Sequence, residues 1–313
     1  MIPSQRDVQQ AFDRVRPHVH QTPVLTSRLL DELSGASIFF KCENFQKMGA
    51  FKMRGAINAI LQIPLADQAK GVVTHSSGNF AQAVSLAAKN LGIPAYIVMP
   101  NNAPQVKKDA VVSYGGIIYE SEATIAAREA MASKIQNKTG ATFLHPSNHI
   151  DVILGQGTAA IELLQEQPSL NCIITPVGGG GLLAGSALAA KYFGSSIGVY
   201  AGEPFNADDG YRSLQSGKIE YNTTVNTIAD GLRTHLGDKN FPIIKTLVTD
   251  IIRVEEQEII AAMKLLWERL KIIIEPSCAV PFAALLRDKK TFAGKKVGII
   301  LSGGNVDLTN LPF

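Results

Sequence analysis

The stretch Cys172-Ile-Ile-Thr-Pro-Val-Gly-Gly-Gly-Gly-Leu-Leu-Ala184 decides the fold class, because an apolar run, a glycine turn and a helical run follow one another directly. Residues 172–175 indicate a buried strand, and the apolar pattern of residues 182–193 predicts a helix. Short strands that alternate with helices are typical of βα units and a parallel sheet. The stretch therefore predicts an α/β protein.

The same alternation continues on both sides of this stretch. Residues 71–75 predict a strand and residues 80–91 a helix, which Gly92 and Pro94 end. Further strands are expected at 95–99, 117–119, 197–201 and 296–301, and further helices at 105–114, 157–165 and 255–270. No low-complexity tract or internal repeat marks a domain boundary.

Composition excludes several classes of protein. Of 313 residues, 46% are hydrophobic and 18% charged, which is typical of a globular chain. A net charge of +3 without a long basic block disfavours nucleic acid and membrane partners. No apolar run approaches the roughly 18 residues that span a bilayer, and the first twelve residues do not resemble a secretory signal. The cysteines, Cys42, Cys172 and Cys278, are odd in number and widely spaced, so we expect a reducing cytoplasm without disulfides or structural zinc.

The glycines at 178–181 follow a strand and begin a helix, where backbone N–H groups and the helix dipole favour an anion. The Lys-Ser/Thr pair of an ATP-binding loop is missing. Phosphate is the favoured ligand of this turn, and a dinucleotide is an alternative. Gly179, Gly181 and Ala184 fit G-x-G-x-x-A, and Glu203 ends the next expected strand, where a ribose-binding acid belongs. A turn that only lets the helix pack is the third interpretation.

Three other features have a structural and a chemical interpretation. Ser76-Ser-Gly-Asn79 and Ser302-Gly-Gly-Asn305 each follow an expected strand, yet either one alone also fits a cap or a turn. Lys52 lies between two apolar residues at the start of an apolar helix. Burial would lower its pKa and make it a nucleophile toward an aldehyde, although a lysine whose stem lies along an apolar surface is commoner.

Four motifs in this order resemble the serine racemase and serine/threonine dehydratase family of fold-type II pyridoxal-phosphate (PLP) enzymes. They are Phe51-Lys52-x-Arg54-Gly55-Ala56, the Ser-Ser-Gly-Asn loop, the tetraglycine turn and the final Ser-Gly-Gly-Asn. The resemblance covers nearly the whole chain and favours pyridoxal phosphate over a dinucleotide. It implies a tryptophan synthase β-like fold, with the cofactor in a cleft between two parallel-sheet-based domains. Residues 1–69 and 149–313 are expected to form the large cofactor-binding domain and residues 70–148 a small inserted domain.

The resemblance also implies roles for the matched residues. Lys52 would form the internal aldimine, Asn79 would bond the ring hydroxyl and Ser302 would face the pyridine nitrogen. A hydroxyl partner there does not enforce a pyridinium, which favours loss of a β-leaving group over a long-lived carbanion. The expected cofactor-binding residues are Phe51, Lys52, Asn79, Gly178, Gly179, Gly180, Gly181, Leu182 and Ser302. The expected substrate-binding residues are Ser76, Ser77, Asn79 and Arg128.

The implied activity is elimination of water from L-serine- or L-threonine-type amino acids, giving a 2-oxo acid and ammonia. Serine racemase activity is expected as well, because Ser77 matches the racemase serine that faces the lysine across the cofactor; a helix cap is its plainer role. A threo-3-hydroxyaspartate dehydratase is one alternative, and a non-catalytic dinucleotide-binding protein is an alternative of another class. Phe80 replaces the family's usual histidine and residues 275–279 vary a usually Gly/Ala-rich stretch, so the substrate stays open.

Glu203, Ala207 and Asp209 match the family's divalent-cation loop, and the resemblance implies Mg²⁺ or Mn²⁺ there, since oxygen ligands suit these hard ions. Without the resemblance this loop would be an acidic surface turn. The resemblance further implies a homodimer that acts on a small amino acid and binds neither nucleic acid nor membrane.

Overall fold

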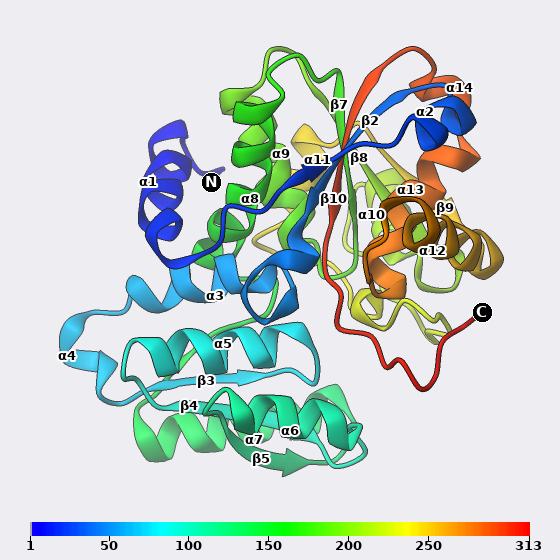
Figure 1. Cartoon of the computed structure of the whole chain (residues 1–313). Helices are drawn as coiled ribbons and strands as arrows, with labels where there is room; N and C mark the ends of the chain where they lie inside the picture. Colours follow the sequence, from blue (N-terminus) through cyan, green and yellow to red (C-terminus); the bar gives the residue numbers. More distant parts are fainter. Residues whose placement is uncertain (1) are drawn as a thin grey trace.

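The computed structural model describes residues 2–313, which form two β-sheets (Figure 1). The six-stranded sheet has the order β1-β2-β10-β7-β8-β9 and is parallel except for the β1–β2 pair. Its strands are β1 (Val24–Leu25), β2 (Ser37–Cys42), β7 (Cys172–Pro176), β8 (Gly198–Pro204), β9 (Asp250–Val254) and β10 (Lys296–Leu301). The four-stranded sheet is parallel throughout, in the order β5-β4-β3-β6. Its strands are β3 (Val72–His75), β4 (Ala95–Pro100), β5 (Ile117–Ser121) and β6 (Thr142–Phe143).

Helices cover both faces of the six-stranded sheet. One face shares a core with α1 (Gln5–Val15), α8 (Ile150–Glu166), α9 (Gly181–Phe193) and α11 (Phe241–Leu247). The other shares a core with α2 (Arg28–Ser34), α12 (Glu256–Leu270) and α13 (Pro276–Arg287). The short helix α10 (Asp209–Ser216) packs against the first core through Tyr211 and Leu214, and α14 (Lys289–Phe292) contributes Phe292 to the second. Every strand of this sheet except the edge strand β1 thus buries apolar side chains, as expected of a parallel sheet.

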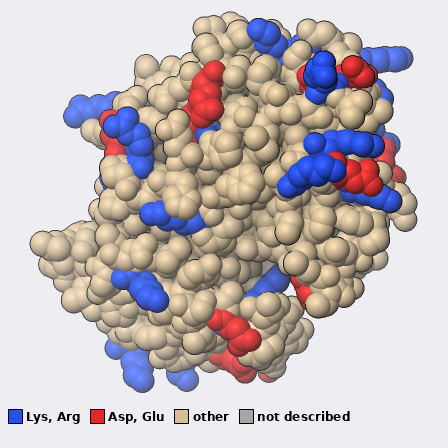
Figure 2. Space-filling model, viewed as in Figure 1, with Lys and Arg blue, Asp and Glu red and all other residues tan. Residues whose placement is uncertain are grey.

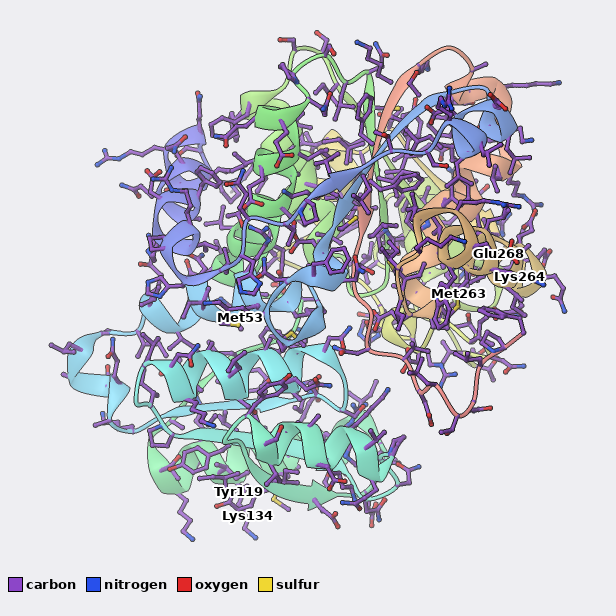
Figure 3. The ribbon with its side chains drawn as sticks, viewed as in Figure 1. Met53, Tyr119, Lys134, Met263, Lys264 and Glu268 are labelled. Atoms are coloured by element: carbon purple, nitrogen blue, oxygen red, sulfur yellow. The ribbon has the colours of Figure 1, made fainter. Side chains whose placement is uncertain are left out.

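The helix α3 (Lys52–Leu61) lies between the two sheets. Its apolar residues share a core with α5 (Asn79–Asn90), and its other side packs on α8. Met53 of α3 lies at this junction, whereas Tyr119 and Lys134 mark the far side of the four-stranded sheet (Figure 3). The remaining helices around that sheet are α4 (Leu65–Gln68), α6 (Gln105–Ser113) and α7 (Ile125–Thr139).

The alternation of strands and helices follows the prediction, with two differences in extent. Helix α8 begins at Ile150 rather than at residue 157, and its glycines allow close packing on α9. A Cβ on Gly157 would lie only 2.5 Å from the Gly185 carbonyl oxygen of α9. Strand β8 continues to Pro204, so that Glu203 lies within the strand.

On the face shown in Figure 2, lysines and arginines are interspersed with acidic side chains. Within residues 2–313 no helix has both the length and the apolar character that crossing a bilayer requires. Cys42, Cys172 and Cys278 are buried free thiols.

Candidate active site

The three loops singled out in the sequence meet at one cavity of about 250 Å³ between the two sheets. Ser76 follows β3, Gly178 follows β7 and Ser302 follows β10, so three strands end at this cavity. All predicted cofactor- and substrate-binding residues line it: Phe51, Lys52, Ser76, Ser77, Asn79, Arg128, Gly178, Gly179, Gly180, Gly181, Leu182 and Ser302. Parallel strands present helix N-termini at their carboxyl ends, which explains why distant loops converge here.

Lys52 is the first residue of α3 and directs its amine into the cavity. Its Nζ donates to the Pro146 carbonyl (2.9 Å) and lies 5.0 and 5.6 Å from the ring centres of Phe51 and Phe80. Burial lowers the pKa of Lys52 to about 8, although the nearby Glu275 carboxylate acts in the opposite direction. A substantial fraction of the amine is therefore neutral and nucleophilic near pH 8.

The start of α3 is fixed to the loop after β10. The Phe51 N–H donates to the Ser302 carbonyl (3.0 Å), and Ala50 forms an isolated bridge with Gly303. Ser302 is 3% exposed and lines the cavity. The two predicted cofactor contacts Lys52 and Ser302 are thus held in register by backbone hydrogen bonds.

The tetraglycine turn connects β7 to α9 and has the geometry of an anion site. Gly180 has φ of +78°, which favours glycine, and the helix begins at Gly181. A Cβ on Gly178 would lie 2.7 Å from Cα of Leu232, and one on Gly179 would lie 2.3 Å from the Ser147 hydroxyl. Asn240 Nδ2 donates to the Gly179 carbonyl (2.8 Å), and this hydrogen bond stabilises the conformation of the turn. The backbone is therefore bare of side chains where a phosphate would lie on the helix N-terminus.

A buried carboxylate adjoins the predicted ring-hydroxyl partner. Asn79 Nδ2 donates to both carboxylate oxygens of Glu275 (3.0 Å each), and its Oδ1 accepts from Asn305 Nδ2 (2.8 Å). Burial raises the pKa of Glu275 to about 7, which the Asn79 hydrogen bond opposes. In the sequence, the 275–279 stretch stands out only as a departure from the family's pattern. The acidic residue preceding Pro276 at the start of α13 is the signal that could have identified it.

The four-stranded sheet contributes the side of the cavity that a substrate would meet. Ser76 and Ser77 follow β3, and the Gly78 N–H donates to Ser76 Oγ (3.3 Å). Arg128 reaches the cavity from α7, and burial lowers the pKa of its guanidinium from the usual value. His75, which the sequence analysis did not single out, lines the same wall and stacks on Phe143 with ring centres 5.5 Å apart.

The segment from His145 to Ser147 forms part of the cavity wall and was also not predicted. Pro146 accepts the Lys52 hydrogen bond, and Ser147 lies against the glycine turn. No local pattern distinguishes this segment, because its importance comes only from what packs against it.

Behind Lys52 lies a buried cluster of charges. Arg54 Nε and Nη2 donate to Glu43 (2.7 and 2.8 Å), and Nη1 and Nη2 donate to Glu162 (2.8 Å each). Lys41 Nζ lies 2.9 Å from Glu162. Arg54, Lys41 and Glu43 are fully buried and Glu162 is 4% exposed. The arginine of the Phe-Lys-x-Arg motif thus anchors α3 to β2 and α8.

The predicted cation loop lies outside this cavity, between β8 and α10. Both oxygens of Glu203 accept backbone N–H groups, from Gly210 (2.9 Å) and Tyr211 (2.7 Å). Asp209 Oδ1 accepts from Asn222 Nδ2 (2.6 Å), whereas its buried Oδ2 has no hydrogen-bond partner. Burial raises the pKa of Asp209 to about 7, and burial together with Asp209 raises that of Glu203. Two buried carboxylates with an unpartnered oxygen fit a cation, although residues 2–313 contain no cluster of three His, Cys, Asp or Glu side chains suited to a metal.

Together, a nucleophilic lysine, a bare glycine turn at a helix N-terminus and a serine at a neighbouring strand end define a pyridoxal-phosphate enzyme. The pyridoxal-phosphate dependent enzyme family matches residues 15–303, and the chain belongs to it. Pyridoxal phosphate is its cofactor, and the predicted fold-type II architecture is confirmed.

Three comparisons place the chain within this family. It is 47% identical over 312 residues to the β-hydroxyaspartate dehydratase of Paracoccus denitrificans, covering 100% of this chain and 99% of that protein. It is 52% identical over 309 residues to the serine racemase of Arabidopsis thaliana, covering 97% and 93%. The crystal structure of serine racemase from Dictyostelium discoideum superposes with a TM-score of 0.94 at 49% identity, covering 98% of this chain and 100% of that one. The predicted membership of the serine racemase and serine/threonine dehydratase family is confirmed.

Family membership resolves the alternatives for the tetraglycine turn in favour of pyridoxal phosphate. The geometry explains why the dinucleotide pattern is misleading. Glu203 is buried, and both of its carboxylate oxygens accept hydrogen bonds from backbone N–H groups of α10. The carboxylate is therefore not available to a ribose.

Proposed function

We propose that the protein eliminates water from L-serine- or L-threonine-type amino acids, giving a 2-oxo acid and ammonia, and that it also interconverts the enantiomers of serine. The observation that carries the proposal is the meeting of the Lys52 amine with the glycine turn and Ser302 in one cavity. The chemistry supplied by pyridoxal phosphate, when bound, is an electron sink for the bond broken at Cα.

The chain's own residues provide attachment, orientation and proton transfer. Gly178 to Gly181 would hold the phosphate through backbone N–H groups, and Ser302 would face the ring nitrogen with a neutral hydroxyl. The Asn79 amide is oriented by Glu275 and Asn305, and one N–H shared by the two oxygens of Glu275 would leave the other N–H for the ring hydroxyl. Lys52 Nζ, with its lowered pKa, would remove the Cα proton.

Ser77 supports racemisation as the second activity. It lines the cavity from the four-stranded sheet, whereas Lys52 enters from α3. A hydroxyl opposite the lysine can deliver a proton to the other face of Cα, which inverts that centre.

A second candidate substrate is threo-3-hydroxyaspartate. Arg128 and His75 line the substrate side of the cavity, and an arginine suits a second carboxylate. Both the Paracoccus denitrificans relative and a Saccharomyces cerevisiae relative, 46% identical over 309 residues, are described as acting on a hydroxyaspartate.

We also propose Mg²⁺ or Mn²⁺ at Glu203, the Ala207 carbonyl and Asp209, with a structural or activating role. The unpartnered Asp209 Oδ2 and the raised pKa values of both acids support it, since a cation would relieve their repulsion. The thermal midpoint should rise on adding Mg²⁺ to EDTA-treated protein, and Asp209→Asn should remove the increase. An equal increase in both proteins would contradict the site.

Three further expectations concern domain movement, oligomeric state and cellular location. Residues 70–148 would move as a small domain that closes the cleft and excludes water. A homodimer is supported by exposed apolar side chains at Phe45, Ile273, Leu308 and Phe313, and sedimentation equilibrium would test it. A cytoplasmic location is consistent with three free thiols.

The test of the main proposal starts from colour and covalent trapping. The pure protein should be yellow, and borohydride should fix the cofactor on Lys52, with Lys52→Ala as the control. A panel of L-serine, D-serine, L-threonine and threo-3-hydroxyaspartate should then release 2-oxo acid from at least one compound. A colourless protein, or a trapped cofactor at another lysine, would refute the proposal.

A further inference from the structure

The segment His145-Pro146-Ser147 contacts Lys52, the glycine turn and His75. It connects β6 of the four-stranded sheet to α8 of the six-stranded sheet. Pro146 accepts from the Lys52 amine (2.9 Å), and the Ser147 carbonyl accepts from Asn240 (3.1 Å), which also holds the glycine turn. His145 begins this segment and lines the cavity beside His75, with ring centres 5.6 Å apart.

The hydrogen bonds of His145 assign its tautomer. Its Nδ1 lies 3.2 Å from the Ser147 backbone nitrogen and 2.9 Å from that of Asn148. Both are N–H donors, so Nδ1 must offer a lone pair and cannot carry a proton. The proton of the neutral ring therefore belongs on Nε2, an assignment made from the hydrogen-bond network. Protonation of Nδ1 would break two hydrogen bonds.

The surroundings also oppose a charged ring. Burial first, and then the positive charge that His75, Lys52, His235 and His149 carry when protonated, lower the pKa of His145 to about 4. These four groups belong to β3, α3, the loop before α11 and the residue before α8. His145 is a neutral hydrogen-bond donor throughout the neutral pH range.

Nδ1 is turned to the segment's own backbone, so Nε2 lies on the opposite edge of a ring that lines the cavity. Within residues 2–313 Nε2 has no hydrogen bond to a protein acceptor, which leaves its N–H for a molecule bound in the cavity. The neighbouring Pro146 holds the Lys52 amine, which must approach Cα to remove its proton. The β-oxygen of a hydroxy amino acid is two bonds from Cα.

We propose that His145 Nε2–H donates a hydrogen bond to the β-oxygen of the bound hydroxy amino acid and thereby selects hydroxylated substrates. This inference rests on the proposed function. The proton is not transferred, because a neutral imidazole N–H is a very weak acid. The hydrogen bond orients the leaving oxygen, and an amino acid without that oxygen leaves the donor unpaired.

Two substitutions separate the ring's two edges. In His145→Asn the amide oxygen can replace Nδ1 as acceptor for the Ser147 and Asn148 N–H groups, but the distal donor is lost. In His145→Gln the amide nitrogen can replace the Nε2 donor, but the acceptor is lost. His18→Asn, outside the cavity, is the matched control.

The holoenzyme variants are compared with L-serine as substrate and L-alanine, which lacks the hydroxyl, as competitive ligand. In His145→Asn we expect the KM for L-serine to rise roughly tenfold, the loss of one hydrogen bond, while the Ki for L-alanine changes less than twofold. His145→Gln and His18→Asn should retain the wild-type ratio of the two constants. Equal changes for both ligands in His145→Asn, or no change for either, would overturn the role.

A measurement on the wild-type holoenzyme covers the case in which the variants do not fold. Long-range ¹H–¹⁵N spectra of ¹⁵N-histidine-labelled protein should place the His145 proton on Nε2 and show no titration between pH 6 and 8. A proton on Nδ1, or a charged ring in that range, would overturn the inference. If the wild type released no 2-oxo acid from any hydroxy amino acid, the proposed function would be refuted. The NMR measurement of the His145 tautomer would remain an independent test of the ring's protonation state.

Discussion

Replacing Arg54 by leucine should strongly destabilise the protein. The substitution removes four hydrogen bonds of 2.7 to 2.8 Å. It leaves buried Glu162 with Lys41 as its cationic partner, and buried Glu43 with the Thr22 hydroxyl as its hydrogen-bond donor. Breaking a buried ion pair by removing one partner costs about 3–5 kcal/mol, because the remaining charge lies uncompensated in the interior. We expect the free energy of unfolding to fall by that amount.

The loss should depend on pH in a direction that the structure fixes. In the wild type Arg54 and Lys41 lower the pKa of Glu162 despite the opposing effect of burial, so this pair stabilises above the acid's ordinary pKa and less as pH falls. Without Arg54, only Lys41 opposes the effect of burial, and we expect the pKa of Glu162 to rise above its value in the unfolded chain. The folded variant then binds more protons than the unfolded one, so its stability should increase as pH falls from 8 to 5.5.

Urea unfolding of the holoenzyme, followed by fluorescence of the single tryptophan Trp267, measures both effects. Arg287→Leu is the matched control, because Arg287 forms an exposed ion pair with Glu258 (2.7 Å), for which about 0–1 kcal/mol is expected. The double variant Arg54→Leu with Glu162→Gln should recover part of the loss. If Arg54→Leu cost no more than Arg287→Leu, or lost stability as pH fell, the assignment of a buried charged anchor would be wrong.

Three further substitutions test the catalytic site. Ser77→Ala should abolish conversion of L-serine to D-serine while pyruvate release continues, as followed by chiral chromatography, and unchanged racemisation would exclude Ser77 as the second proton carrier. Glu275→Gln should move the acid limb of the kcat profile to lower pH, because the carboxylate raises the Lys52 pKa and the neutral amine is the active form; an upward or absent shift would contradict this. Gly180→Ala should weaken pyridoxal-phosphate binding at least roughly tenfold in a fluorescence titration, since φ is +78° and the new Cβ would lie 2.6 Å from Leu236 Cδ2. Gly294→Ala, at φ +70° with no atom within 4 Å, is its control, and equal binding by both would count against the turn.

The parts of the site that could be predicted are those in which one short stretch supplies both the position and the chemistry. The glycine turn is predictable because a strand, four glycines and a helix are consecutive in sequence, and backbone N–H groups need no particular side chain. Lys52 needed more than its apolar neighbours, since a surface lysine with a buried stem has the same local pattern. The order of four motifs decided between these interpretations.

The groups that could not be predicted have roles that depend on tertiary packing. Glu275 is important because Asn79, 196 residues earlier in the chain, donates to it. Pro146 has no functional side chain and contributes only a carbonyl that meets Lys52. His145 became a candidate only through the two N–H groups that fix its tautomer. The length of helix α8 was underestimated, and its glycines are explained by contact with α9.

The division of the site between two sheets explains why the cofactor was easier to predict than the substrate. The groups proposed for the phosphate, the ring nitrogen and the aldehyde come from the ends of β7 and β10 and from α3, which packs on α8. The groups for the amino acid, Ser77 and Arg128, come from the four-stranded sheet and face the first set across the cavity. Local motifs define each set, but the selectivity depends on the distance between the sets. The proposed closure of residues 70–148 would set that distance, and the proposed donor His145 lies on the segment that joins the two sheets.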